Sequence, residues 1–252
     1  MKKILLFALG ACMFTATADA QKQAGGENNL QVLFAPLGGS PISLNYGGIS
    51  YRKFSSDGTS AWRLNLFIGL NNKTEVVGQP DTSHAGSGVL GSTKPQADKT
   101  TSGMTISLRP GYEKHFAGTE SLSPYWGAEL WFTMVTAKEE EDNVVTNATT
   151  ANPDATDWMV LTTTKTGDGA STTFGVGLIA GFDYYIAKNL SLGAEFGFGF
   201  STTSMPDIED ESVTTNATTG ASEVVADPNE IQGSSMNVGP NAIAQFKLGW
   251  LF

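Results

Sequence analysis

The last eleven residues, Ala242 to Phe252, constrain the fold more than any other part of the chain. Successive side chains of a β-strand point to opposite faces of the sheet. One face of this segment would be apolar throughout, with Ala242, Ala244, Phe246, Leu248, Trp250 and Phe252. The opposite face is smaller and more polar and includes Gln245, Lys247 and Gly249. This pattern is typical of a strand that meets lipid on its outer side and a polar space on its inner side.

The same alternation recurs along the chain, and no segment has sustained helical periodicity. We predict eight strands, at residues 29–36, 48–54, 61–71, 104–116, 124–136, 173–186, 190–201 and 242–252. Most are near the ~9–11 residues that a tilted strand needs to cross a bilayer. The connections alternate between short turns and long polar segments, and we expect the long ones to be flexible loops.

Two of the long segments share an internal repeat. Residues 140–150 align without gaps on residues 209–219, and both copies end in the sequence Thr-Asn-Ala-Thr-Thr. Either one hairpin was duplicated or both segments drifted toward the same composition.

The first twenty residues have the pattern of an export signal. Two lysines precede a short apolar run from Ile4 to Phe14, and Ala18-Asp19-Ala20 matches a cleavage site. We therefore expect a signal peptide at 1–20 and a single mature domain at 21–252. Cys12, the only cysteine, loosely fits a lipoprotein cleavage box, which leaves lipidation there as an alternative.

The inward faces of the predicted strands carry equal numbers of cations and anions. They form a predicted interior polar network of Arg52, Arg63, Arg109, Glu113, Glu129, Asp183, Glu195 and Lys247. Eight strands enclose an interior that side chains only just fill, so these charges need to pair. Two hypotheses follow: a neutral polar plug, or a gated pore or proton path.

These features resemble the small outer-membrane barrels of the OmpA/OmpX type. The resemblance implies an all-β fold, an eight-stranded antiparallel up-and-down transmembrane β-barrel in the bacterial cell outer membrane. It also implies an assembly signal at Phe246, Leu248, Trp250 and Phe252, read by the barrel-assembly machinery. The implied surroundings are outer-membrane lipid and lipopolysaccharide, with an extracellular surface ligand as a further partner.

Motifs for catalysis or cofactor binding are sparse. His84 lies in a long loop beside serines, and we expect His115 to be an interfacial residue of the polar rim. The acidic clusters at 139–142 and 207–211 lack the spacing of a calcium loop, and we predict no metal, no cofactor and no enzymatic activity. The formal net charge of −10 argues against nucleic-acid binding.

Four functions fit the sequence. The first is a structural or surface-interaction role through long polar extracellular loops. The alternatives are a small pore or transport protein, a lipid-modifying barrel enzyme, and a soluble periplasmic barrel that binds apolar ligands. The last one needs the apolar faces to point inward, and alternation alone does not distinguish that inversion.

Overall fold

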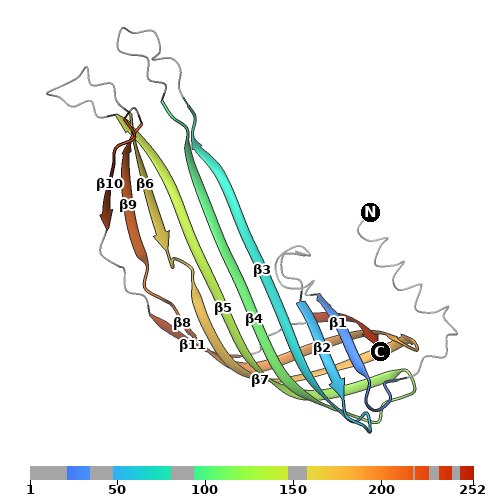
Figure 1. Cartoon of the computed structure of the whole chain (residues 1–252). Coiled ribbons are helices and arrows are strands. Elements are labelled where there is room, and N and C mark those ends of the chain that lie inside the picture. The colour runs from blue at the N-terminus through green and yellow to red at the C-terminus, as the bar shows by residue number, and fades with distance from the viewer. Residues whose placement is uncertain are drawn as a thin grey trace.

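β-strands account for nearly all of the regular structure. The computed structural model describes residues 22–34, 48–80, 94–146, 158–217, 219–226, 233–239 and 245–252. The strands are β1 (Asn28–Phe34), β2 (Gly48–Phe54), β3 (Ser60–Gly78), β4 (Ala97–His115), β5 (Leu122–Thr146), β6 (Trp158–Thr166), β7 (Ser171–Ala187), β8 (Leu190–Ser204), β9 (Glu209–Asn216), β10 (Ser222–Ala226), β11 (Ser234–Gly239) and β12 (Gln245–Leu251) (Figure 1). Among the described residues, no helix has the length and apolar character needed to cross a membrane.

Eight of these strands form a closed antiparallel ring. Its order is β1-β2-β3-β4-β5-β7-β8-β12, and β12 pairs with β1 to complete the circle. The closing pairs run from Asn29↔Leu251 to Phe34↔Phe246. The prediction of an all-β fold with eight antiparallel strands around one interior is therefore confirmed.

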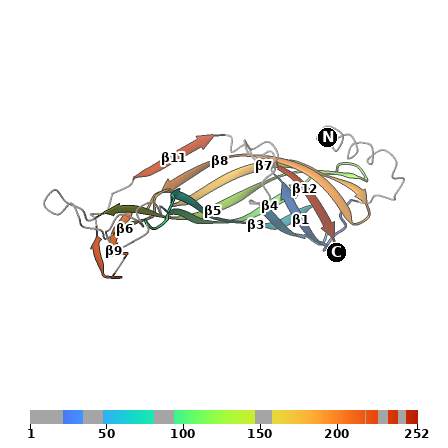
Figure 2. The same ribbon diagram turned by 90° about the horizontal axis from the view of Figure 1, so that it is seen from above.

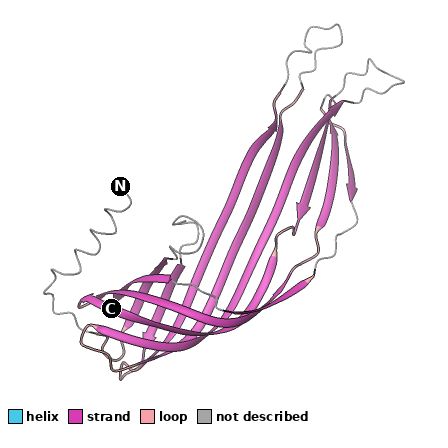
Figure 3. Cartoon of the chain, turned by 180° about the vertical axis from the view of Figure 1, so that it is seen from behind, coloured by secondary structure: helices cyan, strands magenta, loops and turns pink. Residues whose placement is uncertain are grey.

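Each ring strand coincides with one predicted segment, although the bounds differ. β1 ends at Phe34, two residues before the predicted end. β3, β4 and β5 extend well beyond the predicted ranges and rise above the shorter β1 and β2 (Figures 1 and 3). The predicted signal peptide, Cys12, His84 and residues 242–244 lie outside the described residues.

The expectation that the long connections are flexible loops is wrong for much of their length. Above the ring, β5 pairs with β6, β6 with β9, and β9 with β10 (Figure 1). In addition, β11 pairs with β8 (Figure 2). Residues 140–146 of the first copy form the end of β5, residues 209–216 of the second copy form β9, and these two stretches lie on either side of β6. Backbone pairing satisfies the polar main chain of these segments, although neither face is apolar.

The burial pattern of the ring is inverted relative to that of an ordinary domain. The buried residues include Arg52, Glu113 and Asp183, each with no exposed surface. Large apolar side chains are exposed instead, among them Leu130 at 58% and Phe196 at 66%. The polar face therefore points into the ring and the apolar face points outward.

Hydrogen bonds within the β2–β3 turn hold it tightly. Gly58 has a positive φ of 66°, and Asp57 accepts hydrogen bonds from the Ser55 hydroxyl at 2.5 Å and the Thr59 backbone N–H at 3.0 Å. The Ser55 hydrogen bond, followed by those from Thr59, lowers the pKa of the Asp57 carboxyl to about 2. Aspartate before a glycine with positive φ is a common turn arrangement.

Candidate functional site: the charged interior of the ring

The ring brings all eight predicted interior residues together. They come from seven different strands, and all except Arg109 are at most 6% exposed. Arg109 is half-buried, with 19% of its side chain exposed. Four cations face four anions, so the group has no net formal charge, as a low-dielectric interior requires.

Arg63 on β3 is the most connected cation. Its guanidinium lies 2.8 Å from Glu113 Oε1, 2.8 Å from Glu129 Oε2 and 2.6 Å from Glu195 Oε2. β3 and β8 stand on opposite sides of the ring, four places apart in its order, so the pair with Glu195 crosses the interior. Both terminal nitrogens of Arg63 donate to Glu195, which makes the contact bidentate.

A second ion pair also crosses the ring, between strands that lie one place before those of the first pair in the ring order. Arg52 on β2 donates to Asp183 on β7 at 2.7 Å, and those strands are also four places apart. The same nitrogen donates to Glu113 at 3.0 Å. Two charged contacts between opposed strands thus close the interior at this level.

Lys247 on β12 completes the network. Its ammonium lies 3.0 Å from Glu195 Oε2 and 3.9 Å from Asp183 Oδ1. It also contacts the Tyr125 hydroxyl, which donates to Glu195 at 2.6 Å. Tyr125 is only 2% exposed. It was missing from the predicted network, although its side chain points to the same face of β5 as that of Glu129.

His115 lies inside the ring rather than at its rim, which corrects the sequence prediction. It is 6% exposed and packs edge-on against Phe54. Its Nδ1 lies 2.9 Å from the Ser123 hydroxyl and its Nε2 lies 3.2 Å from Glu113 Oε2. Ser123 has no exposed surface, so this histidine–serine pair is closed to substrates.

Glycines on the inner face make room for the indole of Trp131. A Cβ at Gly177 or at Gly199 would lie 2.3 Å from the indole of Trp131. Trp131 is 6% exposed, and its indole N–H donates to Glu129 at 2.5 Å. The glycine-rich faces of β7 and β8 therefore allow an indole to fill the ring above the charges.

Arg109 differs from the other two arginines of the chain. Its Nη1 is 3.8 Å from Glu129 Oε1, which is beyond hydrogen-bonding distance, and among the described residues its Nε donates only to the Ser107 hydroxyl, at 3.4 Å. Its guanidinium carbon lies 5.0 Å from the centre of the Phe67 ring and 5.7 Å from that of Trp131. Two aromatic faces thus hold a cation that has few polar partners.

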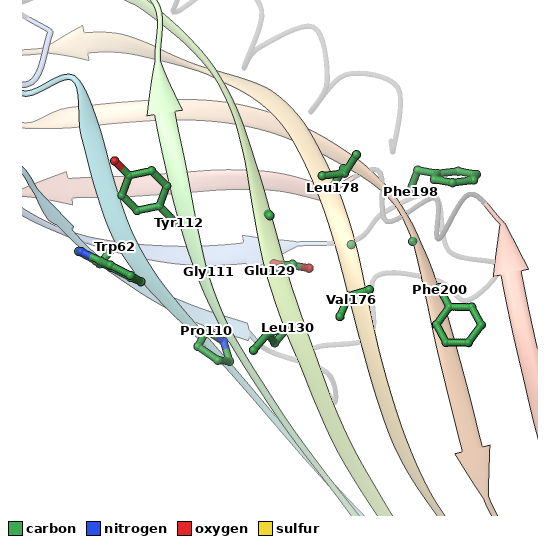
Figure 4. A pocket seen from close by; sticks show the side chains of 13 residues that line it. Trp62, Pro110, Gly111, Tyr112, Glu129, Leu130, Val176, Leu178, Phe198 and Phe200 are labelled. Carbon is green, nitrogen blue, oxygen red and sulfur yellow. The ribbon is translucent and has the colours of Figure 1, made fainter.

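The outer face carries a shallow apolar hollow of about 530 Å³ (Figure 4). Its lining includes outward side chains of β3, β5, β7 and β8, such as Trp62, Leu130, Leu178 and Phe198. The hollow belongs to the exposed apolar band, and no charged side chain of the interior network other than Glu129 contributes to its lining.

The acidic clusters above the ring are paired across strands. Lys99 lies 2.6 Å from Glu139 and 2.9 Å from Glu141, and Lys165 lies 3.5 Å from Asp210. The hydrogen bonds to Glu139 and Glu141 raise the pKa of the Lys99 ammonium. Among the described residues, no group of three or more histidine, cysteine or acidic side chains is arranged to hold a metal ion.

The network can neutralise, fill and stiffen the ring, because Arg52, Arg63 and Lys247 pair closely with its carboxylates, while Arg109 keeps few polar partners. No protein-family model and no curated protein matches this chain.

Proposed function

We propose that this chain is an integral outer-membrane protein, whose ring of eight strands is a transmembrane β-barrel with a structural or surface-interaction role. The observation that carries the proposal is the inverted burial: the interior holds paired charges and the exterior holds exposed apolar side chains. Monomeric soluble proteins rarely expose contiguous apolar surface on this scale, whereas a lipid-facing barrel requires it.

The apolar band has dimensions that suit a bilayer. Along β3, outward apolar side chains run from Trp62 to Leu70 at every second position. At ~3.4 Å per residue this covers about 27 Å along the strand, and a tilt of ~40° reduces it to about 20 Å. The next outward row is polar, with Asn72, Ser102 and Lys138 paired across three strands. A lipid-facing band of about 25 Å is typical of such barrels.

Exposed aromatic side chains gather at the end of the ring that has the short turns. Trp62 is 70% exposed, Trp126 50% and Trp250 56%, and the outward lysines Lys53 and Lys114 lie next to them. Aromatic side chains with lysines beyond them are favourable at the boundary between hydrocarbon and water. This belt supports a periplasmic interface at the short-turn end.

The polar sheet above the ring is the part that would face the outside of the cell. Its cross-strand charges, such as Lys99 with Glu141 and Lys165 with Asp210, suit a hydrated surface. We propose that this sheet contacts lipopolysaccharide or a surface ligand and that the chain has no catalytic role.

The alternatives are less compatible with the interior. A steady pore needs an open path, but Arg52–Asp183 and Arg63–Glu195 cross the ring. A soluble carrier of apolar ligands needs apolar side chains inside, and the structure places them outside. We therefore expect no discrete conductance steps in planar bilayers.

Membrane fractionation combined with heat-modifiable gel mobility tests the proposal. The exported protein should enter the outer-membrane fraction and migrate faster before boiling than after it. Val224→Arg, at a 60% exposed position in the upper sheet, should behave as wild type, whereas Leu178→Arg, at a 61% exposed position in the band, should lose the fast-migrating form. A soluble protein with boiling-insensitive mobility would refute membrane insertion.

A further inference from the structure

We infer that Arg109 forms a binding site for a small monoanionic carboxylate inside the mouth of the ring. The site consists of Arg109 on β4, the flanking rings of Phe67 and Trp131, and the hydroxyls of Ser107 and Thr133. The inference concerns the inner face alone and does not depend on what covers the outer face.

Arg109 has unused donor capacity. A guanidinium has five N–H donors, and the described residues engage only the Nε–H of Arg109, through one long hydrogen bond to Ser107. Arg52 and Arg63, by contrast, each make at least three hydrogen bonds through their terminal nitrogens. Arg109 therefore keeps its two terminal nitrogens available, in the fork geometry that matches a carboxylate.

Two aromatic rings hold the Arg109 side chain in place. The faces of Phe67 and Trp131 lie on the guanidinium at 5.0 Å and 5.7 Å. Trp131 is itself fixed by its hydrogen bond to Glu129 and by close contact with the glycines of β7 and β8. A guanidinium that is already oriented loses little conformational entropy on binding, which favours affinity for a small ligand.

The site is accessible from the end of the ring that faces the upper sheet. Next to Arg109 and Trp131, toward the upper sheet, a row of hydroxyls crosses the inner face: Ser107, Thr133, Thr173 and Thr203, paired strand to strand. Ser107 contacts Thr133 at 2.7 Å, and Thr173 contacts Thr203 at 2.8 Å. Thr133, Thr173 and Thr203 are half-exposed, whereas the charges below are buried, so Arg109 lies where the interior opens.

The charge of the surroundings selects the ligand class. Glu129 lies 3.8 Å from Arg109, and Glu195 also faces the same interior. A doubly charged phosphate would be repelled more strongly by these carboxylates than a singly charged group. A monoanionic carboxylate can accept two parallel N–H bonds from Arg109 while it meets the hydroxyl row.

The chain offers a selective spectroscopic test, because Arg52, Arg63 and Arg109 are its only arginines. We would label arginine and tryptophan with ¹⁵N, place the protein in detergent micelles, and titrate it with sodium acetate at constant ionic strength. The Arg109 Nε–H signal should shift saturably, while those of Arg52 and Arg63 stay fixed. Sodium chloride should shift none of them, and inorganic phosphate should bind more weakly than acetate.

Two variants complete the test. Arg109→Lys keeps the charge but loses the planar guanidinium that can donate two parallel N–H bonds to a carboxylate. It should raise the acetate dissociation constant about tenfold, measured from the indole N–H signal of Trp131. Lys138→Gln removes an exposed cation elsewhere and should leave acetate binding unchanged. An Arg109 signal that does not move, or that moves equally with chloride, would overturn the site. Tighter binding of phosphate would overturn the carboxylate assignment.

Discussion

Replacing Arg63 by glutamine tests whether the interior network stabilises the ring. Arg63 pairs with three carboxylates at 2.6–2.8 Å. Glu113 and Glu195 each keep another cation within 3.0 Å, but Glu129 is left with only Arg109, at 3.8 Å. The variant therefore leaves one carboxylate buried without a close cation, which costs about 3–5 kcal/mol.

The assay is reversible urea unfolding in phospholipid bilayers, followed by tryptophan fluorescence. Lys73→Gln is the matched control, because its ion pair with Glu75 is exposed and should contribute less than about 0.5 kcal/mol. The double variant Arg63→Gln/Glu129→Gln restores neutrality and should show a coupling free energy of about 1–3 kcal/mol. If Arg63→Gln cost no more than Lys73→Gln, the interior network would not stabilise the ring.

Three further substitutions test the lipid-facing band, the packing around Trp131 and the β2–β3 turn. Leu66→Arg, in the central outward row, should cost about 2–4 kcal/mol in bilayer unfolding, and an unchanged free energy would place Leu66 away from lipid. Gly177→Ala should cost about 1–3 kcal/mol because its Cβ would lie 2.3 Å from Trp131, and a shift of the indole N–H signal should accompany the loss. The stabilisation from the depressed pKa of Asp57 is present above pH 4 and is lost as the pH falls toward about 2, because the unfolded carboxyl titrates near ~3.9. Asp57→Asn should remove this loss of stability between about pH 4 and about pH 2, measured as the free energy of unfolding at each pH. If the variant and the wild type lost the same stability over that range, the role of Asp57 would be contradicted.

The ring strands were predictable because each one separates an apolar face from a polar face. Alternation at Trp62, Leu64 and Leu66 predicts the strand and puts Arg63 on the opposite face. It does not determine which face points inward; the burial of Arg63 and the exposure of Leu64 in the structure do. Which charges meet across the interior was not predictable, because that depends on the order of strands around the ring and on their relative height.

The upper sheet was missed because both of its faces are polar. Residues 138–146 are mostly charged, and β6 passes from four consecutive apolar residues to a threonine-rich segment, so period-two hydrophobicity does not mark them as strands. Their pairing depends on main-chain hydrogen bonds and cross-strand contacts such as Thr162 with Asp142, at 2.7 Å. Composition alone therefore favoured a loop.

His115 and Tyr125 show the limit of single-residue reasoning. Both follow the inward parity of their strands, but amphipathic side chains near a strand end can also suit the membrane interface. Their burial follows from partners far away in sequence: Gln23 for His115, and Lys247 for Tyr125. Strand parity, applied without regard to residue type, places both side chains on the inner face.

We propose that the outer face of the ring meets acyl chains. A spin label at Leu178→Cys, compared with one at Val224→Cys, tests it directly, since the two side chains are 61% and 60% exposed. In lipid vesicles, the label at 178 should collide often with oxygen and rarely with a water-soluble nickel chelate, and the label at 224 should show the reverse. Equal chelate accessibility at both positions would contradict the claim.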